Sequence, residues 1–306
     1  MLRRLVVASL LLLAACAVPN GPPANVPATE TTWAPPAQPR AVIVAVHGFN
    51  DFKGAFAEFG DYATKHGLLV EAYDQPGFGA QPDRGHWPGT PALVAALDDA
   101  VRAAHVRYPN VPVYVLGESM GAAVTMMAMS EPKAPAVAGL ILAAPAVWNG
   151  QDLPTAYRTV LRVLANLLPA LRVNARHTKR VASDNIEMLR ALGRDPLYLR
   201  DTTIAGIAGL VELMGQAQID ATTLRLPMLV LLGARDQIVK PQAARRFVAT
   251  LDPASCSVVT YLNGWHLLLR DHQRDRVFAD LVAWVDGRPL PSRLDIRCGS
   301  PASPEG

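Results

Sequence analysis

Short apolar runs alternate along the chain with longer stretches whose apolar residues recur at helical spacing. The clearest apolar runs are residues 41–46, 113–116, 138–144 and 228–232, and residues 257–262 form a further β-like run. Continuous runs of this length predict strands that are buried on both faces, as in a parallel sheet. Helices are expected near 52–66, 91–107, 119–130, 241–250 and 274–286. The alternation predicts an α/β fold, a mainly parallel sheet with helices on both faces.

Two dipeptides mark the starts of helices. Thr90-Pro91 and Lys240-Pro241 each place a proline where a first helical turn tolerates it, because the missing N–H would have no partner there. Residues 25–39 are rich in proline, so we expect from them only one irregular edge strand.

A serine lies between two glycines directly after the run 113–116. Residues 117–121 read Gly-Glu-Ser-Met-Gly, and the apolar stretch that follows has helical spacing. A G-x-S-x-G sequence between strand and helix is typical of a nucleophile elbow, which strains the backbone of its serine and exposes the hydroxyl group. This context predicts that Ser119 is a nucleophile; the alternative is a glycine-flanked turn without chemistry.

Two further residues complete a possible catalytic set in the order serine, acid, histidine. Asp236 follows the run 228–232, and His266 follows the run 257–262. Each therefore lies beyond the carboxyl end of a strand, at the sheet edge where ligands bind. His266 would take the proton of Ser119, and Asp236 would fix the tautomer of His266. Nearby alternatives are Asp220 and Asp252 for the acid and His272 for the base.

The segment after the first apolar run suggests an oxyanion site. Residues 47–50 read His-Gly-Phe-Asn. In a fold with a nucleophile elbow, one oxyanion donor is the N–H after the serine, here Met120, and the other lies in such a loop, where Phe49 is expected. His47 is an alternative base, but it precedes the serine, and we interpret it as a histidine that stabilises the turn.

Together these motifs, with residues 73–79, resemble the α/β-hydrolases of the monoacylglycerol lipase and lysophospholipase type, a group that includes the serine aminopeptidase-like hydrolases. The resemblance covers roughly residues 30–285. It implies an α/β-hydrolase fold, with Ser119, Asp236 and His266 as nucleophile, acid and base. Phe49 and Met120 would donate to the oxyanion.

A long insertion is expected between two strands of the core. Residues 146–226 separate two predicted strands by far more chain than one crossover helix needs, and 157–164 and 204–214 have wide apolar faces at helical spacing. We expect an inserted helical cap that divides the hydrolase core into 40–145 and 227–288. An apolar cap favours acyl chains or other apolar esters; alternatively, its apolar stripes only pack on the core.

The first residues resemble the leader of a bacterial lipoprotein. A basic start at 1–4 and an apolar core at 5–15, too short to span a bilayer, are followed by Cys16 in the sequence Leu-Ala-Ala-Cys. The resemblance implies cleavage before Cys16, lipidation of its thiol and outer-membrane localisation facing the periplasm. Residues 16–39 would form a proline-rich tether. The alternative is an ordinary signal peptide cut near residue 15 or 17.

The two cysteines that follow Cys16 in the chain predict a disulfide. In an oxidising compartment Cys256 and Cys298 have one possible intramolecular pairing, so we expect a disulfide that holds the tail 289–306; two free thiols are the alternative.

The net charge of +3 includes two arginines of the leader, which leaves about +1 and favours neither nucleic acid nor strong electrostatic membrane binding. No Cys/His cluster resembles a metal site, and we expect no cofactor and no protein partner.

These observations predict a lipid-anchored serine hydrolase that cleaves carboxylic esters of monoacylglycerol or lysophospholipid type. An amidase or peptidase would use the same residues, and no motif excludes it. A binding lipoprotein with the same fold but no activity is a third hypothesis, which an intact Ser119, Asp236 and His266 disfavours.

Overall fold

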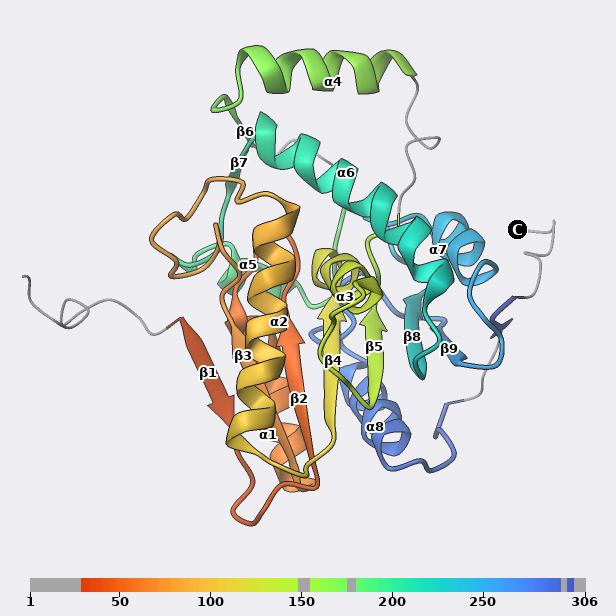
Figure 1. Cartoon of the computed structure of the whole chain (residues 1–306). Helices are drawn as coiled ribbons and strands as arrows, with labels where there is room; N and C mark the ends of the chain where they lie inside the picture. The colour runs from red at the N-terminus through yellow and green to blue at the C-terminus, as the bar shows by residue number, and fades with distance from the viewer. Residues whose placement is uncertain (1–28, 148–154, 175–179, 293–295, 300–306) are drawn as a thin grey trace, which may run out of the picture.

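A computed structural model describes residues 29–147, 155–174, 180–292 and 296–299. Within these ranges eight strands form one sheet in the order β1-β3-β2-β4-β5-β8-β9-β10 (Figure 1). The strands are β1 (Glu30–Trp33), β2 (Ala41–Val46), β3 (Leu68–Tyr73), β4 (Val113–Glu118), β5 (Gly139–Ala143), β8 (Met228–Gly233), β9 (Cys256–Tyr261) and β10 (Ile296–Arg297). The six central strands pair in parallel, and β1 and β10 are antiparallel at the two edges. The predicted fold class is confirmed.

The strands predicted from apolar runs coincide with β2, β4, β5, β8 and β9 to within two residues at either end. The edge strand expected from residues 25–39 is β1. The sequence pattern missed β3, because Glu71 interrupts its apolar run. That carboxylate is satisfied by a bidentate pair with Arg107, whose Nε and Nη2 lie 3.1 and 2.6 Å from the two carboxylate oxygens.

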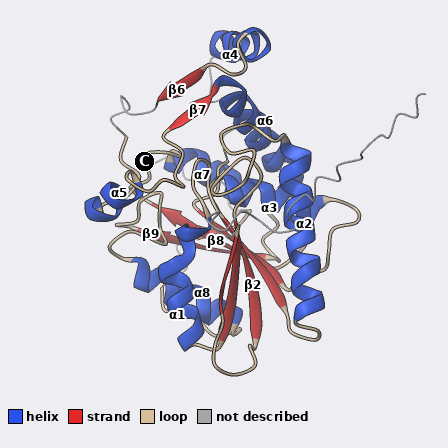
Figure 2. Cartoon of the chain, turned by 90° about the vertical axis from the view of Figure 1, so that its left-hand side faces the viewer, coloured by secondary structure: helices blue, strands red, loops and turns tan. Residues whose placement is uncertain are grey.

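Both faces of the sheet are buried, which explains the continuous apolar runs. Along β2 the side chains of Val42, Val44 and Val46 enter one core cluster, and those of Ala41 and Ile43 enter the other. Helices cover each face (Figure 2). The first cluster lies under α2 (Thr90–Arg107), α3 (Met120–Ser130), α6 (Ile204–Asp220) and α7 (Pro241–Val248). The second lies under α1 (Ala57–Lys65) and α8 (Arg274–Val285).

The elements between β5 and β8 begin over the carboxyl ends of the central strands (Figure 1), and the last of them, the end of α6 and the 3-10 turn after it, pack beside α3. We call them the cap elements; they are α4 (Thr155–Leu167), β6 (Arg172–Asn174), α5 (Ile186–Leu192), β7 (Asp201–Thr203), α6 and the 3-10 turn Ala221–Thr223. α4 forms the outermost layer, above α6. The two expected cap helices correspond to α4 and α6, whereas the antiparallel pair β6–β7 was not predicted, since strands of three residues have too little periodicity to detect.

The C-terminal segment returns to the sheet edge. Cys256 and Cys298 are joined by a disulfide, with Cα atoms 5.9 Å apart, and β10 pairs with β9 beside it. The leader and Cys16 lie outside the described residues. Within the described ranges, no helix is both long and apolar enough to cross a membrane.

Candidate active site

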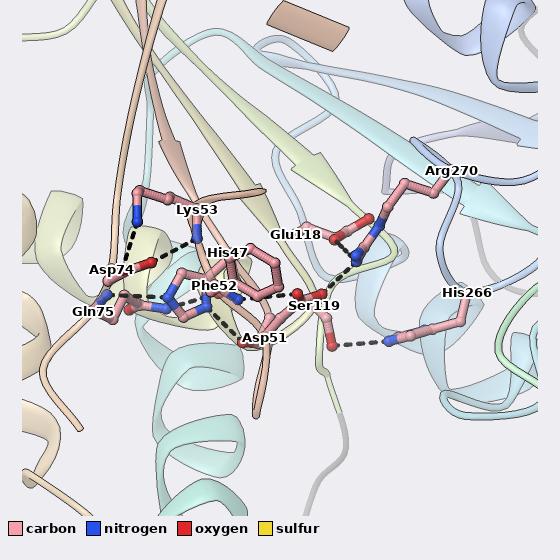
Figure 3. A network of polar contacts seen from close by, with 11 residues as sticks. His47, Asp51, Phe52, Lys53, Asp74, Gln75, Glu118, Ser119, His266 and Arg270 are labelled. Carbon is pink, nitrogen blue, oxygen red and sulfur yellow. Dashed lines mark hydrogen bonds and ion pairs between the residues drawn. The ribbon is translucent and has the colours of Figure 1, made fainter. Parts of the chain in front are cut away.

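Ser119 occupies a strained turn between β4 and α3. Its φ of 54° and ψ of −115° are rarely adopted by a residue with a side chain. The turn is possible because strand and helix pack closely: a Cβ on Gly121 would lie 2.0 Å from the carbonyl oxygen of Val46, and one on Gly117 would lie 2.5 Å from Cα of Ala122. Only glycine fits at these two positions. The half-buried Ser119 hydroxyl thereby points away from the sheet, toward His266 (Figure 3).

The three residues predicted from chain order lie in one hydrogen-bonded chain. Nε2 of His266 lies 2.9 Å from Oγ of Ser119, and Nδ1 of His266 lies 2.8 Å from Oδ2 of Asp236. The other oxygen of Asp236 accepts the backbone N–H groups of Ile238 (2.7 Å) and Val239 (2.9 Å). The carboxylate is acceptor-only, so Nδ1 carries the proton and Nε2 is free to accept the Ser119 hydroxyl.

The charge balance around His266 favours an effective base. Burial disfavours a charged imidazole, but the charge and hydrogen bond of Asp236 and the charge of Glu118 together outweigh this effect, so the pKa of His266 is raised. An imidazole with a raised pKa takes a proton from a hydroxyl group more readily.

The alternative acids and base have other partners. Asp220 accepts a hydrogen bond from Gln216. Asp252 accepts the backbone N–H of Ala254 and pairs with Arg225. His272 is exposed on the loop before α8, where its backbone N–H donates to Asp184.

The loop after β2, residues 47–52, passes beside Ser119. A Cβ on Gly48 would lie 3.4 Å from the Cβ of Ser119, so the following N–H group, that of Phe49, belongs to a segment in contact with the serine. Met120 is the first residue of α3, where an N–H has no acceptor within the helix. The two expected oxyanion donors therefore lie on the two segments next to Ser119, the loop after β2 and the start of α3.

His47 has a structural role in the same loop. It is fully buried; its Nε2 accepts the N–H of Gln75 (3.0 Å), and its Nδ1 lies 2.8 Å from the carbonyl oxygen of Gly48. Burial lowers the pKa of His47 and keeps it neutral. Both ring nitrogens are occupied by the backbone, which confirms the interpretation of His47 as a histidine that stabilises the turn.

Sequence reasoning missed a buried charged cluster behind Ser119. Nη2 of Arg270 lies 2.5 Å from Oδ2 of Asp51 and 3.0 Å from Oε2 of Glu118 (Figure 3). All three side chains are buried. Burial raises the pKa of Glu118, and Arg270 opposes that rise. The available signal was an arginine that ends the apolar run 267–269, four residues after His266.

A cavity of about 420 Å³ opens onto Ser119 and His266. Its walls are mainly apolar, with side chains from α5, from α6 and from the loops that carry Asp236 and His266; they are Leu189, Leu192, Ile207, Leu210, Val211, Met214, Ile238, Val239 and Leu267. Asp51, Glu118 and Tyr198 form a polar part of the lining, and Arg180 and Lys240 are charged residues of the wall that are exposed to solvent. Within the described parts of the chain, no group of three or more His, Cys, Asp or Glu side chains is arranged to hold a metal ion.

The parallel sheet, the strained serine turn at the end of β4 and the cap elements define an α/β-hydrolase fold. The profile of the family described as "Serine aminopeptidase, S33" matches residues 37–273. The chain therefore belongs to this family of α/β-hydrolases.

Individual relatives are consistent with this assignment. The chain is 26% identical over 255 residues to a monoacylglycerol lipase of Mycolicibacterium smegmatis, covering 83% of this chain and 90% of that protein. It is 25% identical over 268 residues to human monoglyceride lipase, covering 84% and 86%. The crystal structure of Paleococcus ferrophilus monoacylglycerol lipase superposes with a TM-score of 0.73 at 19% identity, covering 84% of this chain and 98% of that one, which shows a shared fold.

Proposed function

We propose that this protein is a serine hydrolase that cleaves carboxylic esters of lipid-like substrates, of the monoacylglycerol or lysophospholipid type. The observation that carries the proposal is the hydrogen-bonded chain Ser119–His266–Asp236 at the wall of an apolar cavity. The names of the relatives, monoacylglycerol lipase and phospholipase, support the same substrate class.

The geometry supports a two-step reaction. Oγ of Ser119 attacks the ester carbonyl while Nε2 of His266 takes the hydroxyl proton, and the N–H groups of Phe49 and Met120 stabilise the oxyanion. The intermediate collapses to an acyl-enzyme, and the alcohol leaves with the proton from His266. Water then attacks the acyl group, giving its proton to His266, and the acid leaves as Oγ of Ser119 regains a proton.

The cavity indicates an acyl chain as one part of the substrate. Most of its lining is apolar, and Ile207, Leu210, Val211 and Met214 lie on the same helix, α6. Burying a methylene group in such a wall contributes about 0.8 kcal/mol. Rates should therefore rise with acyl length until the cavity is filled.

A peptidase activity has less support from the cavity. An aminopeptidase would need a carboxylate free to bind the substrate's ammonium group. The carboxylates of Asp51 and Glu118 line the cavity, but both accept hydrogen bonds from Arg270. Because the family is described as serine aminopeptidase, we include an amide substrate in the test of the function.

The test compares ester and amide substrates on one preparation. p-Nitrophenyl esters of two to sixteen carbons, 1-monooleoylglycerol, lysophosphatidylcholine and leucine p-nitroanilide are assayed with wild type and Ser119→Ala. We expect hydrolysis of the esters and a loss on the order of 10⁴-fold or more in Ser119→Ala. Faster hydrolysis of the anilide than of every ester would contradict the ester assignment, and more than a tenth of wild-type activity in Ser119→Ala would contradict the nucleophile.

We further propose that the protein is a lipoprotein, anchored through Cys16 at the outer membrane and facing the periplasm. The basic and apolar leader before Cys16 supports this address, and the disulfide between Cys256 and Cys298 fits an oxidising compartment. Exposed apolar side chains on the outermost helix, α4, would favour contact with lipid; they include Val160, Val163 and Leu167.

The anchor has its own test. Cys16→Ser should release the protein from membranes or block its processing, and mass spectrometry of the wild type should find an acylated N-terminus. A domain that begins near residue 25 should hydrolyse soluble short esters at an unchanged rate and lose efficiency on membrane-embedded substrates. An unacylated mature N-terminus would contradict the anchor and leave the hydrolase proposal intact.

A further inference from the structure

One buried guanidinium connects the segments that carry the proposed catalytic groups. Nη2 of Arg270 donates to Asp51 and Glu118, and Figure 3 shows these side chains converging beside Ser119. Glu118 is the last residue of β4 and directly precedes Ser119. Asp51 lies two residues after Phe49, in the loop after β2. Arg270 lies four residues after His266, and its N–H closes a turn on Leu267.

Each side chain of the cluster is tied to its own segment. The N–H of Asp51 donates to Gly48, and its carboxylate accepts the N–H of Phe52. Moving the guanidinium therefore moves the loop that carries the oxyanion donor. Glu118 is bonded covalently to Ser119, so a displaced Glu118 side chain shifts the serine turn directly.

The chemistry of the cluster suits arginine better than lysine. A guanidinium is planar and rigid, and it stays charged when buried, whereas an ammonium group is a point charge on a flexible stem. The carboxylates of Asp51 and Glu118 raise the pKa of Arg270 further. Removing one partner of a buried charged cluster leaves an uncompensated charge, so the cluster constrains geometry strongly whatever its net effect on stability.

We propose that Arg270 is a positioning residue of the hydrolase. Its guanidinium holds three segments in fixed positions relative to one another: the serine turn, the loop after β2 and the loop after His266. In that arrangement Nε2 of His266 lies 2.9 Å from Oγ of Ser119, and the loop that carries Phe49 stays beside the serine. This inference rests on the proposed function, since it assigns Arg270 a role in the same reaction.

A role in charge compensation alone and a role in positioning predict different activities for a double variant. Formally, two carboxylates and one guanidinium give the cluster a net charge of −1. Arg270→Gln alone gives −2, whereas Arg270→Gln with Glu118→Gln returns it to −1, the charge of Asp51. The double variant therefore restores the formal charge without restoring the bridge between segments.

The experiment measures kcat, KM and Tm for Arg270→Gln, Arg270→Lys and the double variant with p-nitrophenyl butyrate. We expect kcat to fall about 10²-fold in Arg270→Gln, because misplacement by about 1 Å has that effect, with KM changed less than threefold. Arg270→Lys should recover about a tenth of wild-type kcat. The double variant should gain Tm over Arg270→Gln while its kcat stays at least 30-fold below wild type, about 2 kcal/mol of lost transition-state stabilisation.

A matched control removes a buried carboxylate that does not line the cavity. Asp280 on α8 accepts hydrogen bonds from Tyr261 (2.8 Å) and the N–H of Ser292 (2.7 Å). Asp280→Asn should lower Tm and leave kcat within twofold of wild type. This variant separates the loss of buried polar contacts from the loss of positioning.

Two results would overturn the inference. The first is a kcat within twofold of wild type in Arg270→Gln. The second is a kcat within twofold of wild type in the double variant, which would mean that Arg270 only compensates charge. If Arg270→Gln does not fold, the same twofold limit on kcat is applied to Arg270→Lys and to the double variant. The Ser119→Ala variant, run alongside, separates the two proposals. If it is inactive while the Arg270 variants keep wild-type kcat, only the positioning role fails.

Discussion

Replacing Asp236 by asparagine should reverse the tautomer of His266. One carboxylate oxygen of Asp236 accepts the N–H groups of Ile238 and Val239 at 2.7 and 2.9 Å, and the other accepts Nδ1–H of His266 at 2.8 Å. In Asp236→Asn the amide oxygen keeps the two backbone bonds, because only an oxygen can accept them. The amide NH₂ then faces Nδ1, which must become an acceptor, so the proton moves to Nε2.

The consequence for Ser119 follows from the 2.9 Å contact between its Oγ and Nε2 of His266. A protonated Nε2 has no lone pair to take the serine proton, so the base is lost although every side chain remains in place. We expect kcat to fall on the order of 10⁴-fold, which is about 5.4 kcal/mol of transition-state stabilisation. Stability should change little, since the backbone bonds of the loop persist.

The assay compares kcat for p-nitrophenyl butyrate and Tm across three variants. Asp236→Asn should lose activity at nearly constant Tm, whereas Asp236→Ala should lose activity and also lower Tm, because the loop bonds disappear. Asp252→Asn, at the alternative acid, should keep kcat within twofold. A loss below tenfold in Asp236→Asn, or inactivation by Asp252→Asn instead, would refute this assignment of the acid.

Three further predictions test other parts of the account. The pKa of His266 is raised and its neutral form is the base, so kcat/KM should fall as the pH drops through a midpoint above 6.5, the usual imidazole value; a midpoint below 6 would contradict this. Gly121→Ala places a Cβ 2.0 Å from the oxygen of Val46 and should lower both Tm and kcat; a variant with wild-type values of both would show that the turn tolerates a side chain. Cys298→Ser removes the disulfide to Cys256, which lies 42 positions earlier in the chain, and should lower the free energy of unfolding by up to about 4 kcal/mol. Urea titration measures this change, and an unchanged midpoint would mean that the disulfide is absent from the purified protein.

Local patterns in the sequence were sufficient for most of the fold. A strand buried on both faces is mostly apolar, so β2 and β8 were visible as runs, and Asp236 follows β8 directly. β3 was missed because the partner that allows Glu71 inside a buried strand, Arg107, is 36 positions away. Long-range pairing of this kind leaves no periodic signal.

The same limit explains what was missed at the site. Chain order and strand ends located Ser119, Asp236 and His266, since these constraints are local. The contacts of Arg270 with Asp51 and Glu118 span 219 and 152 positions, and no pattern within one segment predicts them. The antiparallel pair β6–β7 of the cap elements was missed for another reason, the shortness of its strands.

The central claim is that Ser119 is a nucleophile activated by His266, and covalent labelling tests it most directly. The protein is treated with a fluorophosphonate, and the modified peptide is identified by mass spectrometry in wild type, Ser119→Ala and His266→Ala. We predict one adduct per molecule on Ser119 in the wild type, none in Ser119→Ala, and labelling slowed by orders of magnitude in His266→Ala. An adduct on another residue, or ester hydrolysis without any adduct, would contradict the account.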